Sequence, residues 1–447
     1  MKIHIKTYGC QMNERDSEAL AGMLIEAGHT MVDAEEAADV LLFNTCSVRE
    51  QAERKAKGKI GYMKKLKARN PDLIIGALGC MAQRLGNELL NELPHLDFVL
   101  GTGQLHTLVP LVESIRADRK QVVAITESAE VLTGMRTHYR HAGAGEPDFK
   151  AQIAITRGCN RFCSYCIVPY VRGREISRSR EDVVTEAREL AADGAKELLL
   201  LGQNVAAYGW GGDVNPPPSG VSPFAELLEE LDRIPELLRI RFTSPYPTYF
   251  NDRLIAAIAG SRTVCHNIHL PLQSGSDRVL AAMNRQYTAK SYRAVVAALR
   301  AAMPDVTFST DVIVGFPGET DEDFCLTREL MNEVGFDNSF IFKYSPRPGA
   351  KSASDADSVS QEVKEERNAL LLEDLKTRVA VALQDLVGTV QEVLVEGISP
   401  RNPERWSGRT GTNRLVHFLP VPNLEPGTLR QVKITRAGGV SLFGELL

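Results

Sequence analysis

The sequence predicts a three-part chain: an N-terminal α/β domain on a parallel sheet, a central partial (β/α) barrel and a small C-terminal all-β barrel. Strand patterns alternate with helical patterns in two series separated by a break, and such alternation implies parallel sheets. After residue 388 the pattern changes to short alternating segments between glycines, which is typical of a small barrel. A length of 447 residues agrees with about three domains.

The first series occupies residues 1–118, and a connection follows over 119–148, where the alternation stops. Apolar runs predict strands at 2–8, 40–44, 73–78 and 98–100. Helical spacing of apolar residues predicts helices at 14–27, 50–68 and 83–92. We therefore expect the N-terminal domain to be a parallel sheet covered by helices.

The second series, over 149–378, contains about six strand–helix units, which suits an open (β/α) barrel. Its strands are expected at 152–156, 197–201, 239–243, 267–272, 307–314 and 339–344. Its helices are expected at 180–192, 223–234, 252–259, 277–283, 291–302 and 321–334. A charged helix over about 358–386 leads into the last unit, 379–447, with strands at 390–395, 414–419 and 431–436.

The composition is that of an ordinary globular chain, with 43% hydrophobic and 24% charged residues. No apolar run approaches the ~18 residues of a membrane span, and the first residues alternate like a strand rather than a secretory signal. A net charge of −5 argues against wholesale nucleic-acid binding, but residues 156–180 carry six arginines against one glutamate. A local basic site is therefore compatible with the acidic whole.

Three of the eight cysteines, Cys159, Cys163 and Cys166, lie together directly after a predicted strand, and we call them the loop cysteines. Thiolates suit iron–sulfur clusters or zinc. A structural zinc site takes four ligands, and no fourth cysteine or histidine follows nearby. A cubane cluster held by three cysteines leaves one iron open to a non-protein ligand. A zinc loop with a distant fourth ligand is the alternative.

Three other cysteines, Cys10, Cys46 and Cys80, each follow the end of a predicted strand, and we call them the N-terminal cysteines. The C-terminal ends of parallel strands lie on one edge of a sheet, where ligands bind. These cysteines are therefore expected to converge and to hold a second cluster. The alternative for each is a small buried residue, which is what we expect of Cys265 and Cys325.

The loop 159–166 resembles the CxxxCxxC signature of radical S-adenosylmethionine (SAM) enzymes, and the chain over about residues 1–445 resembles the radical SAM methylthiotransferase family. Five stretches resemble the branch that acts on isopentenylated adenosine in tRNA: YGCQMNE (8–14), NTCSVRE (44–50), GCMAQ (79–83), TRGC (156–159) and IVPYVRGREISR (167–178). After the first cysteine this chain has QMN, whereas the branch acting on a ribosomal-protein aspartate typically has PKN and the threonylcarbamoyladenosine branch KVN.

The resemblance implies a tRNA-modifying transferase with two 4Fe–4S clusters. The loop cysteines would hold the cluster whose open iron binds SAM, and the N-terminal cysteines an auxiliary cluster that carries the inserted sulfur. Two SAM molecules would serve each turnover, one to methylate the sulfur and one to form a 5′-deoxyadenosyl radical. The radical would take hydrogen from carbon 2 of N6-(dimethylallyl)adenosine at position 37, giving the 2-methylthio product.

The implied partners are a tRNA carrying isopentenylated adenosine in its anticodon loop, an electron donor and a sulfur or cluster donor, the last two of unknown identity. We expect a cytoplasmic monomer with no membrane attachment. The C-terminal unit resembles a TRAM domain, an OB-like RNA-binding barrel. Two rival hypotheses are the same chemistry on a protein aspartate or on threonylcarbamoyladenosine, and a non-enzymatic iron–sulfur or zinc protein that binds RNA.

Active sites of barrels lie at strand ends. Candidate SAM contacts there are Gln203, Asn204, Gln273, Ser274, Gly315 and Gly318. A tight turn is an equal explanation for the two glycines. Candidate phosphate contacts are Arg172, Arg174, Arg178 and Arg180 beside the loop cysteines, and Arg405, Arg409, Arg414, Lys433 and Arg436 in the small barrel. For each of these, a solvated charged surface is the alternative.

Overall fold

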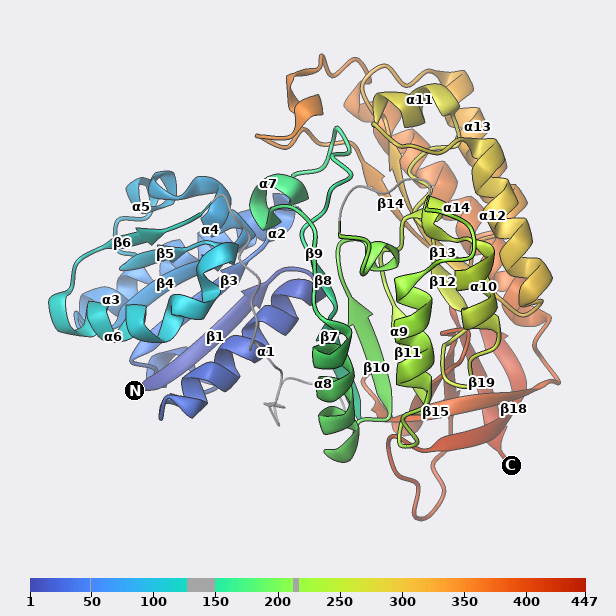
Figure 1. The fold of residues 1–447 in the computed structure, drawn as a ribbon, viewed down its shortest axis with the longest axis horizontal. Coiled ribbons are helices and arrows are strands. Elements are labelled where there is room, and N and C mark those ends of the chain that lie inside the picture. The colour runs from blue at the N-terminus through green and yellow to red at the C-terminus, as the bar shows by residue number, and fades with distance from the viewer. Residues whose placement is uncertain (49, 127–148, 212–216) are drawn as a thin grey trace.

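The computed structural model describes residues 1–48, 50–126, 149–211 and 217–447, so most of the predicted connection 119–148 lies outside the described residues. Figure 1 shows the N-terminal lobe on the left, in blue, beside the central barrel, with the red C-terminal barrel below the central one. The predicted three-part fold class is confirmed. Among the described residues, no helix is both long and apolar enough to cross a membrane.

The N-terminal lobe is a six-stranded parallel sheet in the order β2-β1-β3-β4-β5-β6. Its strands are β1 (Lys2–Tyr8), β2 (Thr30–Met31), β3 (Val40–Thr45), β4 (Ile74–Gly79), β5 (Phe98–Leu100) and β6 (Val122–Ala124). Its helices are α1 (Gln11–Glu26), α2 (Glu50–Tyr62), α3 (Lys64–Arg69), α4 (Cys80–Leu85), α5 (Asn87–Glu92) and α6 (Leu108–Asp118). The strand β6 lies beyond the predicted boundary at residue 118.

The unbroken apolar runs of β3 and β4 follow from burial of both faces of the sheet. Leu42 and Leu78 pack in one cluster with residues of α1 and α6. Leu41 and Phe43 pack in a second cluster with residues of α2 and α5. A strand covered on both faces reads as continuously hydrophobic, which explains why the sequence located these strands.

The central unit is an open barrel of six parallel strands in two ladders, β11-β10-β7 and β12-β13-β14. A bridge between Ile240 and Val264 joins the ladders. The strands are β7 (Lys150–Ala154), β10 (Glu197–Leu201), β11 (Arg239–Phe242), β12 (Asn267–His269), β13 (Thr307–Val314) and β14 (Asn338–Lys343). The outer helices are α8 (Arg180–Ala192), α9 (Pro223–Asp232), α10 (Asp252–Ala259), α11 (Asp277–Ala282), α12 (Ala289–Ala302) and α13 (Asp321–Val334).

Between β7 and α8 the chain forms β8 (Thr156–Arg157), α7 (Val168–Arg172) and β9 (Ile176–Ser177). The loop cysteines lie between β8 and α7. Figure 1 places α7 between the central barrel and the N-terminal lobe, and α7 contacts α4 of that lobe. The loop that carries one set of cysteines is thus continuous with an element that touches the domain of the other set.

The C-terminal unit is a closed five-stranded barrel in the order β15-β16-β17-β19-β18. Its strands are β15 (Val390–Ser399), β16 (Asn402–Thr410), β17 (Leu415–Phe418), β18 (Leu429–Gly438) and β19 (Ser441–Leu446). The long helix α14 (Gln361–Gln384) packs against both β14 and β18, so the predicted boundary at residue 378 falls inside it. Buried Arg239 of the central barrel donates to the backbone oxygen of Arg409, which fixes the small barrel to the base of the large one.

Candidate functional site

The N-terminal cysteines lie at the C-terminal ends of three adjacent strands. Tyr8 pairs with Thr45 and Thr45 with Gly79, so β1, β3 and β4 end at the same level. Cys10 and Cys46 follow β1 and β3 closely, and Cys80 begins α4. The expected shared edge is therefore present in the structure, while the binding of a cluster there stays a prediction.

A pair of asparagines that the sequence analysis did not single out holds this edge together. Asn13 Nδ2 donates to Asn44 Oδ1 at 3.0 Å, and Asn44 Nδ2 donates to the backbone oxygen of Asn13 at 2.8 Å. Both side chains are fully buried. Their proximity to Cys10 and Cys46 in the sequence was the available signal, since each lies within three residues of a cysteine.

Two of the thiols at this edge, those of Cys10 and Cys46, share a hydrogen bond. A hydrogen bond from Cys46, opposed by burial, lowers the pKa of Cys10 to about 5. The same hydrogen bond and burial raise the pKa of Cys46. Burial raises the pKa of Cys80, and the neighbouring Arg172 guanidinium opposes that shift. Of these three thiols, that of Cys10 is therefore the most acidic.

The loop cysteines lie in a tight loop between β8 and α7. Gly158, at φ +77°, has no room for a side chain, because a Cβ there would lie 2.0 Å from the backbone oxygen of Arg174. Arg285 Nη1 donates to Cys163 Sγ at 3.3 Å while its guanidinium lies 4.4 Å from the centre of the Tyr246 ring. Burial raises the pKa of Cys159 to about 12. Metal binding must therefore release protons from this loop.

Neither cysteine set is arranged as a site for a single metal ion. Among the described residues, no three His, Cys, Asp or Glu side chains are placed to hold one metal ion. Each set also has a cation beside its thiols, Arg285 at the loop cysteines and Arg172 at the N-terminal cysteines. Cations there offset the negative charge that thiolates and cluster would bring together.

The candidate SAM contacts divide into two groups. Gln203 lies next to the loop cysteines, since its Oε1 accepts from the amide of Gly158 at 2.6 Å. Asn204 is buried, its Oδ1 accepts from the amide of Tyr246, and its Nδ2 has no hydrogen-bond partner among the described residues. Both side chains follow the C-terminal end of β10, which ends at Leu201, and their contact with SAM stays a prediction.

The remaining SAM candidates are occupied by contacts within the protein. Ser274 Oγ lies 3.1 Å from Thr327 Oγ1 in α13. The amide of Gly315 donates to Glu319, and a Cβ on Gly315 would collide with Lys364. Gln273 has φ +67° and its amide donates to the backbone of Asp311. Gly318 donates its amide to Ser358. The turn explanation thus accounts for both glycines.

Inside the barrel, β12, β13 and β14 carry polar and aromatic side chains that alternate with their helix-facing core residues. His269 bridges Ser309 and Asp311, at 3.0 and 3.2 Å. Phe340 and Phe342 are 47% and 38% exposed, with ring planes 14° apart and ring centroids separated by 6.5 Å. Exposed aromatic rings on an inner barrel wall form a surface on which a planar group can stack.

The candidate RNA arginines of the central unit are mostly engaged in ion pairs. Arg172 is buried against Asp16, and Arg178 pairs with Asp182 and Glu186. Arg174 is exposed, with its guanidinium 4.3 Å from the centre of the Phe162 ring. Burial of Arg172 removes it from contact with a phosphate at the surface.

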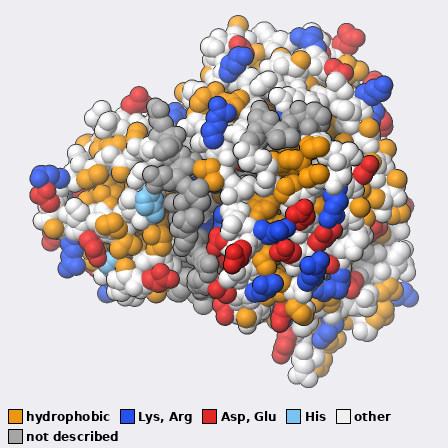
Figure 2. Space-filling model, viewed as in Figure 1, with side chains coloured by type: hydrophobic (Ala, Val, Ile, Leu, Met, Phe, Trp, Pro, Cys, Tyr) orange, Lys and Arg blue, Asp and Glu red, His pale blue; other side chains and the backbone are white. Residues whose placement is uncertain are grey.

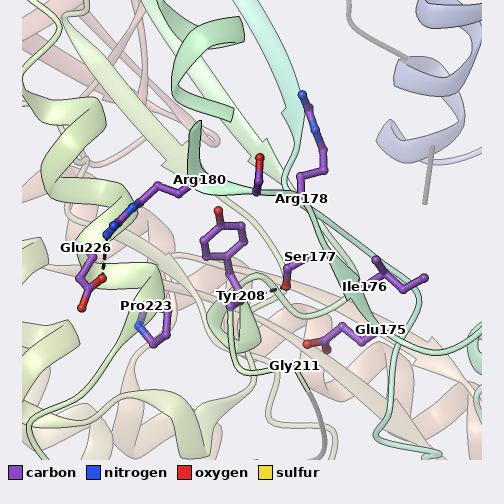
Figure 3. Close-up of a pocket in the computed structure, with 11 residues that line it drawn as sticks. Glu175, Ile176, Ser177, Arg178, Arg180, Tyr208, Gly211, Pro223 and Glu226 are labelled. Atoms are coloured by element: carbon purple, nitrogen blue, oxygen red, sulfur yellow. Dashed lines mark hydrogen bonds and ion pairs between the residues drawn. The ribbon is translucent and has the colours of Figure 1, made fainter. Parts of the chain in front are cut away.

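Arg178 and Arg180 line a pocket of ≈ 580 Å³ at the start of α8 (Figure 3). Arg180 reaches across to Glu226 at 2.7 Å, and burial raises the pKa of Tyr208 to about 12. Figure 2 shows Lys and Arg side chains interspersed with Asp and Glu over α8 and α9. The described residues of this face therefore form no continuous basic surface.

The small barrel separates its basic residues into two groups. Arg405 and Arg436 both lie over the Phe443 ring, at 5.6 and 3.9 Å from its centroid, and His417 packs against the same ring. Arg409 and Arg414 instead pair with Glu396 and Asp337. Exposed Lys433 lies on the same strand as Arg436. We call Arg405, Arg436, His417 and Phe443 the basic–aromatic cluster.

Family models match the chain in three segments that follow the fold. Residues 2–101 match "Uncharacterized protein family UPF0004", residues 153–331 the radical SAM superfamily and residues 384–447 the TRAM domain. The fold is similar to that of the radical SAM methyltransferase TsrM from Kitasatospora setae, with a TM-score of 0.59 at 14% identity, covering 79% of this chain and 75% of that one. The cobalamin-dependent radical SAM enzyme OxsB has a TM-score of 0.51 at 12% identity, over 85% and 56% of the two chains.

Curated relatives match from end to end. A protein of Opitutus terrae named tRNA-2-methylthio-N(6)-dimethylallyladenosine synthase is 45% identical over 100% of this chain and 97% of its own length. Proteins of the same name from Dictyoglomus thermophilum and Ralstonia nicotianae are each 44% identical, over 100% of this chain and 98% and 97% of their own lengths. The chain therefore belongs to the family of tRNA-2-methylthio-N(6)-dimethylallyladenosine synthases.

Proposed function

We propose that the protein is a tRNA-modifying transferase that inserts a methylthio group at carbon 2 of N6-(dimethylallyl)adenosine at position 37. This function is supported by two separate sets of three cysteines on two packed domains, in a chain whose full-length relatives bear that name. A binding protein without chemistry would not need two sites. The relatives' name favours a tRNA adenosine over a protein aspartate or threonylcarbamoyladenosine.

The enzyme uses two 4Fe–4S clusters and SAM. The loop cysteines would hold one cluster through three irons, and the N-terminal cysteines the other. Bound there, the first cluster would supply the electron that cleaves SAM, and the second would supply sulfur. Around the loop cysteines, Arg285 orients Cys163, and Gln203 fixes the amide of Gly158. The buried Nδ2 of Asn204, which has no hydrogen-bond partner in the part of the chain that the structure describes, suits a polar group of SAM.

The substrate adenine would enter the barrel from the side of β14. The Phe340–Phe342 pair offers a face for stacking, and stacking on aromatic rings is how proteins hold unpaired bases. His269, held by Ser309 and Asp311, offers a ring nitrogen beside that face. An anticodon-loop base can be turned out of its stack at low cost, which allows it to reach a radical inside a barrel.

The basic–aromatic cluster is the surface we assign to the tRNA backbone. It combines two guanidinium groups with an aromatic ring, a combination typical of single-stranded RNA sites. We infer that an electron donor and a sulfur or cluster donor complete the cycle, and that the protein works as a monomer in the cytoplasm.

The experiment is anaerobic reconstitution of the full chain with iron and sulfide, followed by incubation with SAM, a reductant and tRNA carrying N6-(dimethylallyl)adenosine. We expect 5′-deoxyadenosine and 2-methylthio-N6-(dimethylallyl)adenosine, detected by chromatography and mass analysis of nucleosides. Cleavage of SAM with no change in that tRNA would refute the substrate assignment. Absence of iron after reconstitution would refute the assignment of an iron–sulfur enzyme.

A further inference from the structure

The helix that follows the loop cysteines is seated directly on the N-terminal cysteine site. Ile167, just before α7, and Val171, inside α7, form a buried cluster with Cys80. The backbone oxygen of Val171 accepts from Thr102 Oγ1 at 2.5 Å. The last residue of this helix, Arg172, therefore enters the N-terminal lobe from the central barrel.

One carboxylate of the N-terminal lobe receives two arginines that bracket the loop cysteines. Asp16, in the second turn of α1 after Cys10, accepts from Arg172 Nη2 at 3.1 Å and from Arg157 Nη2 at 3.3 Å. The side chains of Asp16 and Arg172 are 5% and 3% exposed. A buried carboxylate with two guanidinium groups leaves one positive charge without a counter-charge in this triad.

That remaining charge lies beside the N-terminal cysteines. Arg172 Nη1 is buried and has no hydrogen-bond partner among the described residues. The Cys80 and Cys10 thiols both lie within electrostatic range of the Arg172 guanidinium. A buried donor left over beside a thiol is costly unless a ligand accepts from it.

We propose that Arg172 is a positioning residue of the auxiliary cluster, held by Asp16 so that its Nη1 donates a hydrogen bond to a sulfur of that cluster or to its Cys80 ligand. The proposal rests on the assignment of a cluster to the N-terminal cysteines. A hydrogen bond and a positive charge at a cluster sulfur stabilise the reduced state and so raise the reduction potential. The radical SAM domain would thereby set the potential of a cluster that it does not ligate.

The test uses the full chain in which the loop cysteines are replaced by alanine, so that only the auxiliary cluster gives a signal. The midpoint potential of that cluster is followed by electron paramagnetic resonance during reductive titration. We expect Arg172→Met to shift the potential to more negative values and Arg172→Lys to shift it less. Arg174→Met, two residues away and exposed, is the matched control and should leave the potential unchanged.

A second measurement detects the Arg172 side chain directly, while it is present. With ¹⁵N-labelled arginine, pulsed electron paramagnetic resonance of the reduced cluster should show a weak nitrogen coupling, and Arg172→Lys should remove it. The proposal is overturned if the chain without loop cysteines shows no ¹⁵N coupling. It is also overturned if Arg172→Met keeps its iron and its cluster potential is unchanged. If the chain without loop cysteines binds no iron, the cluster assignment falls as well. Missing methylthio product in the wild-type chain, with these signals intact in the chain without loop cysteines, counts against the proposed function alone.

Discussion

Replacing Gly79 with alanine should empty the auxiliary site while leaving SAM cleavage intact. Gly79 ends β4 immediately before Cys80, at φ 90° and ψ −155°, a conformation that essentially only glycine adopts. A Cβ there would lie 2.4 Å from Asn44 Oδ1 and 2.6 Å from the backbone oxygen of Thr45. Relief of the clash must therefore move β3, on which Cys46 depends, or turn Cys80 away.

The energetic cost can be worked from these contacts. The backbone strain costs about 1–3 kcal/mol. The forced displacement of packed neighbours adds about 1–3 kcal/mol, as overpacking does in other cores. A total of about 2–6 kcal/mol is a large share of the stability of one domain, which is typically about 5–15 kcal/mol. The lobe should fold with a locally distorted edge or open frequently at β4.

Two measurements follow this change. The iron content after reconstitution should fall from about eight to about four per chain, and hydrogen exchange at β4 should show a lower opening free energy. The control is Gly58→Ala in the exposed middle of α2, where a Cβ meets nothing within 4 Å. That variant should keep all its iron and be more stable by about 0.5–1 kcal/mol. Full iron content and unchanged exchange in Gly79→Ala would refute the argument.

Three further predictions concern the other units. Replacing the N-terminal cysteines by alanine should abolish methylthio insertion while reductant-dependent 5′-deoxyadenosine persists, whereas replacing the loop cysteines should abolish both and leave about four irons; the reverse pattern means that the roles are exchanged. Burial would raise the pKa of Asp323, but hydrogen bonds from Arg278, Ser276 and Thr320 hold it below the usual 3.8, so its stabilisation is present above about pH 4 and lost as the pH falls below that value. Chemical denaturation across pH 2–6 should then show a shallower acid loss in Asp323→Asn, and equal slopes would contradict this. Arg405→Gln and Arg436→Gln should each weaken tRNA binding and reduce its salt dependence by about one unit of slope, measured by filter binding, while the ion-paired Arg409→Gln should change the slope little.

The sequence located most strands because their faces are buried. The strands β3, β4 and β10 each contain a run of apolar residues, and the structure buries nearly all of their residues. It missed β16, whose residues NPERWSGRT are polar and include a proline, because this strand gains its place from pairing with β15 and β17. Helices predicted as continuous at 50–68 and 83–92 are each divided, the second at Gly86 with φ +49°.

The sequence predicted the candidate site only where a residue's place at the end of a strand determines which other residues lie near it. The N-terminal cysteines could be placed together because parallel strand ends must share an edge. The role of Arg172 could not be predicted, because its partner Asp16 is 156 residues away in the sequence. The contact exists only once the two domains dock. Arg172 has several other arginines close to it in the sequence, and such a residue is expected at the surface. Only the structure shows that it is buried.

The docking contacts explain why two cluster sites can serve one substrate. Arg15 and Asp16 of α1 meet Glu186, Arg157 and Arg172 of the central unit, and the side chains of all five are at most 14% exposed. Buried ion pairs add little net stability over apolar packing, but their removal one partner at a time is costly. They therefore disfavour any docking that separates these carboxylates from their arginine partners. A sulfur donor and a radical source must act on the same carbon, and a fixed orientation supplies the proximity that this transfer requires.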